Sequence, residues 1–227
     1  MWEHRHPYPP FIPQGTKRLI VGTLPPPRFS LGQLKPKDVN FCYGSSDGYL
    51  WPILNEIYDL NLKYENTEEA ISQRKDFLTK HQLGICDIVH SCKRQKIDAS
   101  DLGMTEVVLR DLLGVLEAHP HINQLIFTGG NSKNGPEYFF RRLLKKKDVA
   151  FRRVNDTIPR QHCFDWAGRR IDTFSLTAPS GAANRAVGSL EAYKQMKRNN
   201  PQMNTLDFRV LQYREIFQRN SSAIPKT

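Results

Sequence analysis

The segment Lys17-Arg-Leu-Ile-Val-Gly-Thr-Leu-Pro-Pro-Pro27 decides how this chain is expected to fold. Its apolar residues run directly into a glycine, and three prolines follow. A buried strand that ends in a Gly/Pro turn is typical of the carboxyl edge of a parallel sheet, where backbone N–H groups and short polar side chains are presented to a ligand. Because proline fixes φ, such a turn holds its shape at a low cost in conformational entropy.

A second segment of the same kind, Leu176-Thr-Ala-Pro-Ser-Gly-Ala-Ala-Asn-Arg185, follows much later in the chain. The first turn continues into Phe41-Cys-Tyr-Gly-Ser-Ser-Asp-Gly-Tyr-Leu-Trp-Pro52. Parallel strands present their carboxyl ends at one edge of a sheet. We therefore expect the two turns to face each other and to form a rigid cleft suited to a phosphate backbone or a small ring.

Hydrophobic periodicity predicts strands that alternate with helices. The expected strands are 17–22, 82–89, 124–128 and 171–176, and the expected helices are 50–60, 66–80, 105–118, 135–147, 188–198 and 205–218. The segment 91–103 is expected to be an exposed loop. This order predicts the α/β class, with a mostly parallel sheet that carries helices on both faces. We expect a single domain over 1–227, with an N-terminal arm at 1–15 and a loose tail at 220–227.

Composition excludes several classes of protein. Hydrophobic residues make up 39% and charged residues 25% of the 227 residues, as in ordinary globular proteins. No apolar run approaches the ~20 residues of a membrane span, and the N-terminus has no signal-peptide pattern. The four cysteines form no CxxC pair, so we expect reduced structural thiols, no metal site and a cytoplasmic protein.

The net charge of +10 is unevenly distributed. Residues 131–227 hold 19 Lys and Arg against 8 Asp and Glu, whereas residues 1–130 hold 14 against 15. A one-sided basic surface attracts phosphates and speeds encounter with nucleic acid, although a basic face with no partner is also common.

Several standard catalytic patterns are absent from the sequence. It contains no GxGxxG or GxxxxGK[ST] nucleotide fingerprint and no GxSxG nucleophile elbow. His162 and Cys163 are adjacent, but neighbours in sequence seldom form a working catalytic pair.

Three motifs together carry a family resemblance: Gly22-Thr-Leu-Pro-Pro26, Tyr43-Gly-Ser-Ser-Asp-Gly-Tyr-Leu-Trp-Pro52 and Ala178-Pro-Ser-Gly-Ala-Ala-Asn-Arg185. In their order and placement they resemble the uracil-DNA glycosylase superfamily. They are most similar to its small single-domain branch of mismatch-specific uracil glycosylases and hypoxanthine-DNA glycosylases. The segments His6-Pro-Tyr-Pro-Pro-Phe-Ile-Pro13 and Gly84-Ile-Cys-Asp-Ile-Val-His-Ser-Cys92 also resemble that branch.

This resemblance implies a three-layer α/β/α sandwich that flips a nucleotide out of DNA and hydrolyses its N-glycosidic bond. Such an enzyme needs a group that places water and offsets an oxocarbenium-like sugar, together with donors for the departing base. It also compensates an unstacking cost of roughly a few kcal/mol. The resemblance implies DNA as the partner, either double-stranded with a flipped nucleotide or single-stranded, and the chemistry needs no metal or organic cofactor. We expect a monomer.

The sequence departs from the family pattern where many members carry catalytic groups. Leu24 stands where an Asn or a carboxylate is common, and Gly48 stands where an Asn is common. Asp47 and Asp87 are the candidate catalytic residues. The alternatives are an Asp-Gly turn for Asp47, and a strand-end cap or an ion pair for Asp87.

The resemblance also places binding residues. Tyr43 corresponds to an aromatic that stacks on the flipped base, and Thr128, Asn131, Gly22 and Thr23 lie where the family reads the base. The expected DNA-binding residues are Pro25, Pro179, Ser180, Gly181, Ala182, Asn184 and Arg185. The alternatives are a core aromatic for Tyr43, a cap for Asn131 and a surface ion pair for Arg185.

The resulting hypothesis is a monofunctional DNA glycosylase that removes a damaged or modified base. The base could be uracil, hypoxanthine or a hypermodified base of phage DNA, and the last would make the protein part of antiviral defence. The alternatives are a DNA-binding module of the same fold without catalysis, and a hydrolase of free nucleosides or nucleotides.

Overall fold

The computed structural model describes residues 1–98, 100–155 and 157–219. These residues fall into two compact units. Unit 1 comprises Met1–Ser46 and Leu62–Ala178, and the described part of unit 2 comprises Asp47–Asn61 and residues 179–219. The expected single domain therefore stays a prediction, and the expected loose tail at 220–227 lies outside the described residues.

The centre of unit 1 is a six-stranded sheet. In spatial order its strands are β3 (Leu83–Asp87), β2 (Arg18–Gly22), β6 (Gln124–Phe127), β9 (Arg169–Ser175), β8 (Arg160–Trp166) and β7 (Arg152–Arg153). The first four strands pair in parallel, and β8 and β7 extend the sheet in antiparallel pairing. The predicted α/β class with a mostly parallel sheet is confirmed.

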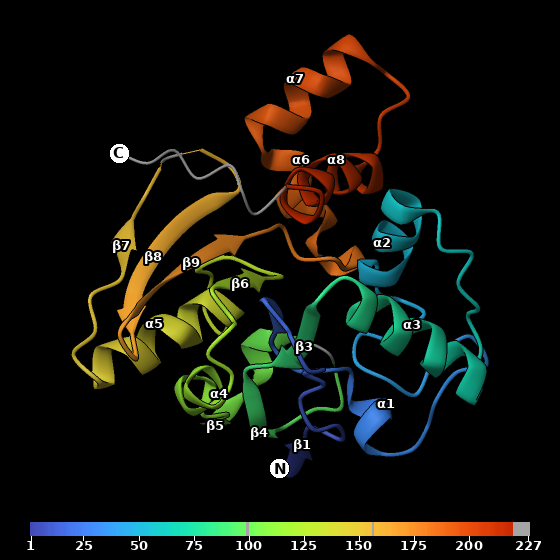
Figure 1. Ribbon diagram of the computed structural model, residues 1–227. Coiled ribbons are helices and arrows are strands. Elements are labelled where there is room, and N and C mark those ends of the chain that lie inside the picture. The colour runs from blue at the N-terminus through green and yellow to red at the C-terminus, as the bar shows by residue number, and fades with distance from the viewer. Residues whose placement is uncertain (99, 156, 220–227) are drawn as a thin grey trace. The chain divides into compact units, whose positions relative to one another are not determined.

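The α-helices of unit 1 are α1 (Pro27–Ser30), α3 (Glu68–Lys80), α4 (Leu112–Ala118) and α5 (Pro136–Lys146). Successive residues of β2 point to opposite faces of the sheet. Leu19 and Val21 belong to the core cluster that includes residues of α4 and α5. Ile20 points to the other face of the sheet and is also fully buried. Figure 1 shows α5 beside β8 and β9 and α3 beside β3.

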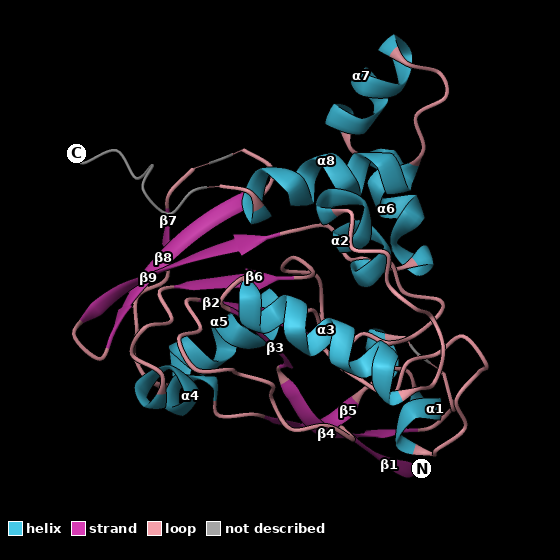
Figure 2. Ribbon diagram, turned by 45° about the vertical axis from the view of Figure 1, so that its right-hand side comes forward, coloured by secondary structure: helices cyan, strands magenta, loops and turns pink. Residues whose placement is uncertain are grey.

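A second, smaller sheet lies in unit 1. Its strands are β1 (Trp2–Arg5), β4 (Val89–Arg94) and β5 (Thr105–Leu109), in the order β1-β4-β5 and with antiparallel pairing. Figure 2 shows these strands together near the N-terminus. The expected N-terminal arm is thus built into the unit, because β1 pairs with β4 and Phe11 exchanges two backbone hydrogen bonds with Ile85 of β3.

Two predictions for this region were wrong. The expected helix at 105–118 is instead β5 followed by α4. Thr105, Val108 and Leu109 pair with β4, and Asp111 starts a new helix by accepting the Gly114 N–H at 3.0 Å. The expected exposed loop at 91–103 is also wrong, since its first residues complete β4 and it contains the short 3-10 helix η1 (Asp101–Gly103).

The antiparallel strand β8 has no counterpart among the predicted elements. It is joined to β9 by a tight turn in which Ala167 and Gly168 adopt φ of 48° and 74°. Positive φ at both central residues is the geometry of a two-residue hairpin. The Ala-Gly pair is a weak sequence signal for it, because alanine rarely adopts positive φ.

The loop that leads to Tyr43 is anchored by Asp38. The buried Asp38 carboxylate accepts hydrogen bonds from Arg28 Nε at 2.7 Å, from the Lys35 N–H at 2.8 Å and from the Ser46 N–H at 2.7 Å. Burial by itself raises the pKa of Asp38, but the hydrogen bonds from Arg28, Ser46 and Lys35 outweigh it and hold this pKa well below its usual range.

We expect Asp38→Asn to lower the free energy of unfolding by about 2 kcal/mol at pH 7, because charge-assisted hydrogen bonds are lost. A carboxyl whose pKa is lowered on folding stabilises the protein above its unfolded-state pKa, and this contribution is lost as the pH falls below about 4. The difference between variant and wild type should therefore shrink in urea unfolding at pH 3. Asp165→Asn, which removes an exposed ion pair with Arg152, is the control and should cost less than about 1 kcal/mol. Equal losses in the two variants would contradict the anchoring role.

Unit 2 is helical. Its elements are α2 (Leu50–Tyr58), the 3-10 helix η2 (Gly181–Ala183), α6 (Asn184–Ser189), α7 (Glu191–Asn199) and α8 (Thr205–Phe217). The Tyr49 N–H donates to the Pro179 carbonyl at 2.8 Å, and the Tyr58 hydroxyl donates to the Phe217 carbonyl at 2.9 Å, which ties α2 to the C-terminal helices. In the part of the chain that the structure describes, no helix combines the length and the apolar character that a membrane crossing requires.

Candidate active site

Three strands of unit 1 bring polar groups to one edge of the sheet. Gly22 at the end of β2 is in register with Asp87 at the end of β3, and Thr128 directly follows β6. The parallel pairing of β6 with β9 places Leu176 at the same edge. The expectation that the two turn-forming strands end at one edge of the sheet is therefore confirmed.

The side chains of Tyr43 and Asp87 pack against the backbone of Gly22. A Cβ atom at this position would lie less than 3.0 Å from both the hydroxyl oxygen of Tyr43 and Oδ1 of Asp87. Only glycine allows these two side chains to pack against the backbone so closely. The strand end thus carries an aromatic hydroxyl and a carboxylate side by side.

Asp87 is held by His6. The His6 Nε2 atom lies 2.8 Å from Asp87 Oδ2, and only 1% and 6% of the two side chains is exposed. The Tyr8 N–H donates to His6 Nδ1 at 3.1 Å, so Nδ1 is the acceptor nitrogen and the Nε2–H faces the carboxylate. His6 fixes one oxygen of Asp87, and the other oxygen faces Gly22.

The sequence pointed to Asp87 but not to His6. The histidine stands in the His6-Pro-Tyr-Pro-Pro segment, which carried part of the family resemblance, and its partner is 81 residues away. Nothing local in the sequence reveals that pairing, because it depends on Phe11 running beside Ile85 and on β1 pairing with β4.

Tyr43 and Thr128 form the second pair of the site. Their hydroxyl oxygens lie 2.8 Å apart, and Thr128 is buried while Tyr43 is half-buried. Tyr43 has a φ of 57°, a conformation that is unfavourable for a bulky residue and that often occurs at functional sites. The structure thus brings together Gly22, Tyr43, Asp87 and Thr128 of the predicted site residues.

Asp101 of η1 also reaches this edge, and sequence reasoning missed it because it lay in the expected exposed loop. The Thr23 hydroxyl hydrogen-bonds to its carboxyl group. Burial raises the pKa of Asp101 to about 7, and the nearby Asp87 charge acts in the same direction. Arg94 and the hydrogen bond from Thr23 act in the opposite direction and lower this pKa. The buried Asn134 fastens η1 to the loop after β6, since its Nδ2 donates to the Asp101 carbonyl at 2.9 Å.

The remaining predicted residues of unit 1 have simpler surroundings. Asn131 is exposed in the loop that follows β6, and Pro25 is buried within the turn after β2. Leu24 packs against the core cluster, which leaves that position without a polar group. Arg160 lies at the same edge, because it is in register with Ser175 at the end of β9 and a Cβ on Gly130 would lie 2.7 Å from its Nη2.

The other predicted residues belong to unit 2. Asp47 is exposed and precedes Gly48, which forms an isolated antiparallel bridge with Ser180. Arg209 holds the 179–185 segment from inside, since its guanidinium donates to the Ser180 carbonyl at 3.0 Å and to Asn184 Oδ1 at 2.8 Å. Pro179 is buried, whereas the most exposed members of the segment are Gly181, Ala182 and Arg185.

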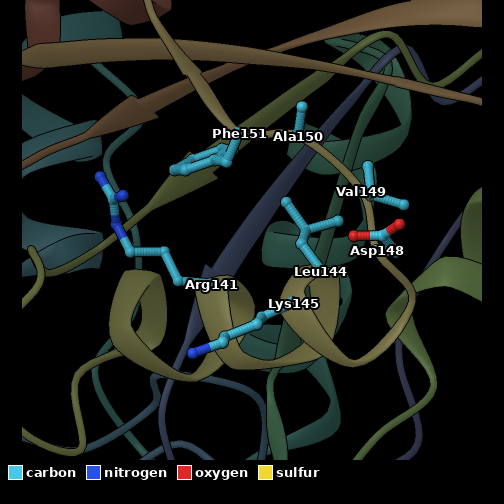
Figure 3. A pocket seen from close by; sticks show the side chains of 7 residues that line it. All are labelled: Arg141, Leu144, Lys145, Asp148, Val149, Ala150 and Phe151. Carbon is cyan, nitrogen blue, oxygen red and sulfur yellow. The ribbon is translucent and has the colours of Figure 1, made fainter.

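A hollow of about 320 Å³ lies elsewhere in unit 1, between the end of α5 and the segment that follows it. Figure 3 shows Arg141, Leu144 and Lys145 on the helix and Val149 to Phe151 on the segment. The Arg141 guanidinium lies 4.7 Å from the centre of the Phe151 ring and is bound to the buried Glu137 and to His162. No predicted site residue lines this hollow, so we do not include it in the candidate site.

The site therefore consists of oxygen and imidazole groups. Within residues 1–98, 100–155 and 157–219, no three His, Cys, Asp or Glu side chains gather as metal ligands would. All four cysteines are buried in unit 1, where burial raises the pKa of the Cys86 thiol well above its usual range. The buried Asp87 carboxylate, which faces an aromatic hydroxyl and a strand-end turn, can hold water beside a small ring.

No family model matches this chain, and no curated protein matches it. A solved structure does match. It is the solution NMR structure of a protein from Methanosarcina acetivorans that has been assigned provisionally as a uracil DNA glycosylase. The match covers 96% of this chain and 100% of the other, with a TM-score of 0.54 and 16% sequence identity.

The fold is uracil-DNA glycosylase-like. At this identity the likeness concerns the fold, and a fold supports many activities. The function has to be argued from the residues at the carboxyl edge of the sheet.

Proposed function

We propose that the protein is a DNA glycosylase that hydrolyses the N-glycosidic bond of a nucleotide flipped out of DNA. The observation that carries the proposal is the Asp87 carboxylate, which is held by His6 and packed beside Tyr43 on Gly22. This group lies at the edge of the sheet where α/β folds bind their ligands.

The reaction requires a carboxylate close to the sugar. As the bond between C1′ and the base nitrogen breaks, its electron pair leaves with the base and positive charge develops on the sugar. Asp87 offsets that charge and accepts a proton from the water that attacks C1′. His6 contributes by holding one carboxylate oxygen, so the other stays directed at the strand end. Asp47, in unit 2, is proposed as a second carboxylate for the same reaction.

Tyr43, Thr128 and Asn131 are proposed to bind the base. The linked hydroxyl groups of Tyr43 and Thr128 present a donor and an acceptor beside Gly22 and Thr23. Asn131 is exposed in the next loop and offers both an amide N–H and a carbonyl. Stacking of the base on the Tyr43 ring would contribute about 1–3 kcal/mol.

Basic side chains support a DNA partner. The exposed Arg152 and Arg153 lie on β7, the exposed Arg170 lies on β9, and Arg160 lies at the edge that carries the site. In unit 2 the exposed Arg185 stands in a segment of small residues, where a phosphate can approach the backbone closely and bind a guanidinium.

The finer parts of the proposal concern the base and the biological role. We propose that a deaminated base such as hypoxanthine or uracil, or a hypermodified phage base, is the substrate, as in the small single-domain branch of the superfamily. We further propose that a cytoplasmic monomer acts without a cofactor. Leu24 favours one alternative, a DNA-binding module without catalysis, because the turn after β2 lacks the usual polar group.

A duplex-cleavage experiment tests the proposal. The protein is incubated with fluorescent duplexes that carry uracil, hypoxanthine, xanthine or a glucosylated cytosine, and alkali then breaks the strand at abasic sites. We expect scission of at least one modified duplex and none of the unmodified duplex. Salt-sensitive binding without scission of any duplex would favour the binding module, and release of bases from free nucleosides alone would favour a nucleoside hydrolase.

A further inference from the structure

We propose that Asp101 is the general acid of this reaction and donates a proton to the departing base, which makes purines the favoured substrate class. The inference rests on the proposed glycosylase function and assigns a role to Asp101, a carboxyl group that belongs to unit 1 together with Asp87. The argument starts from where η1 is held.

Two side chains, Asn134 and Arg94, hold the η1 segment in place through three hydrogen bonds. Asn134, in the loop after β6, donates to the backbone carbonyl of Asp101 at 2.9 Å and to that of Met104 at 3.3 Å. The buried Arg94 of β4 donates to the Ser100 carbonyl at 2.6 Å. The backbone of Asp101 is therefore positioned by structure and not by a free loop, as a catalytic group requires.

The carboxyl group of Asp101 faces the site. It is hydrogen-bonded to the hydroxyl of Thr23, the residue directly after Gly22, and the negative charge of Asp87 is close enough to raise its pKa. Asp87 Oδ1 lies against Gly22 itself. Two carboxyl groups thus flank consecutive residues of the turn that follows β2.

The two carboxyl groups have different surroundings. The Asp87 carboxylate has the His6 N–H as its partner. The pKa of Asp101 is raised to about 7, mainly because burial removes water from its carboxyl group and also because the negative charge of Asp87 is near. Arg94 and the Thr23 hydroxyl lower this pKa and only partly offset the rise. Two carboxyl groups with such different partners can divide the roles of base and acid in one reaction.

The proposed step balances as follows. The oxygen of water bonds to C1′ and gives a proton to the Asp87 carboxylate, while the bond between C1′ and the base nitrogen breaks and its electrons go to the base. The Asp101 carboxylic acid gives its proton to a ring nitrogen of the base, so that the base leaves neutral. Afterwards Asp101 is a carboxylate and Asp87 is protonated, and exchange with solvent restores both.

The acid matters most for bases that leave poorly as anions. A purine such as hypoxanthine offers a ring nitrogen that accepts a proton as the bond breaks, whereas uracil leaves as an anion whose charge is spread over two carbonyl oxygens. General acid catalysis typically contributes 10²–10⁴-fold, and this contribution should apply to the purine alone.

A titration tests the acid without any substrate. Carbon-13 NMR of labelled aspartate follows each carboxyl carbon with pH, and the signal of Asp101 is assigned by its absence in Asp101→Asn. We expect a midpoint near pH 7, in surroundings set by Asp87, Arg94 and the Thr23 hydroxyl. A midpoint below about pH 5 would overturn the inference whatever the enzyme cleaves.

Single-turnover excision from matched duplexes tests the role. Asp101→Asn should lower the rate on hypoxanthine by at least about 100-fold and the rate on uracil by less than about 3-fold. In the wild type we expect the rate on hypoxanthine to fall above pH 7, where Asp101 loses its proton, and this fall should be absent in Asp101→Asn. Asp98→Asn is the control, because its exposed carboxyl lies in the same loop and also interacts with Arg94. It should keep both rates and the pH profile.

The outcomes separate this inference from the proposed function. Excision of hypoxanthine by the wild type with an unchanged rate and pH profile in Asp101→Asn overturns the inference alone. Wild-type excision of uracil without excision of any purine does the same. Absence of scission from every modified duplex overturns the glycosylase and the role of Asp101 together.

Discussion

Asp87→Asn is expected to lower the single-turnover rate of base release by at least about 100-fold, while the affinity for duplex DNA changes by less than about 3-fold. The side chain keeps its size, and its carbonyl oxygen can still accept the His6 N–H that lies 2.8 Å from the carboxylate. What is lost is the negative charge beside the developing cation and the group that takes the proton from water. Quenched-flow measurement of abasic sites, with affinity from fluorescence anisotropy, separates catalysis from binding.

Asp47→Asn is the comparison for that experiment. Asp47 is also an aspartate of the predicted site, but it is exposed and belongs to unit 2. We expect the larger loss in Asp87→Asn, because a buried carboxylate interacts more strongly with a nearby charge than an exposed one. If Asp47→Asn lost activity and Asp87→Asn kept full activity, the catalytic carboxylate would be Asp47 and not Asp87.

Gly22→Ala is expected to remove activity and to lower the free energy of unfolding by about 1–3 kcal/mol. The added methyl group would lie less than 3.0 Å from both the Tyr43 hydroxyl and Asp87 Oδ1, so at least one of the two side chains has to move. Movement of Tyr43 would break its 2.8 Å contact with Thr128. Urea unfolding and the duplex-cleavage assay measure the two effects.

Gly188→Ala is the matched control for the glycine. Gly188 lies in α6, and a Cβ atom there meets no other atom within 4 Å. Since alanine favours a helix over glycine by about 1 kcal/mol, this variant should be as stable as the wild type or slightly more stable. A Gly22→Ala protein with wild-type stability and a wild-type rate of base excision would show that Tyr43 and Asp87 do not pack closely against this glycine.

Much of the fold could be predicted from local patterns. The strand that ends at Gly22, the strand that ends at Phe127 and the helix that begins at Pro136 all carry strong signals, because an apolar run, a Gly/Pro turn and a first-turn proline each act within a few residues. The placement of Gly22, Asp87 and Thr128 at one edge followed from the rule that parallel strands share their carboxyl edge.

Where a segment's structure depended on a distant partner, prediction failed. Val107 and Val108 fit a helical period as well as a strand, and the pairing of β5 with β4 decided between them. The strand β8 was missed because its apolar residues are interrupted by charge, and it forms only as the hairpin partner of β9. Asp101 was missed for the same reason, since Arg94 and Asn134 hold η1 from other parts of the chain.

The amino-acid sequence by itself determined the class of sheet and the stiffness of the turn after β2, and it placed a carboxylate, Asp87, on the strand that is β3, because these depend on neighbours within a few residues. The tertiary structure alone decided that His6 meets Asp87, that Tyr43 meets Thr128 and that Asp101 reaches Thr23. The first two pairs join residues more than eighty positions apart, and the third joins Thr23 to a segment that other parts of the chain hold in place. Such contacts form only after the strands have chosen their order and register, and no local propensity encodes that choice.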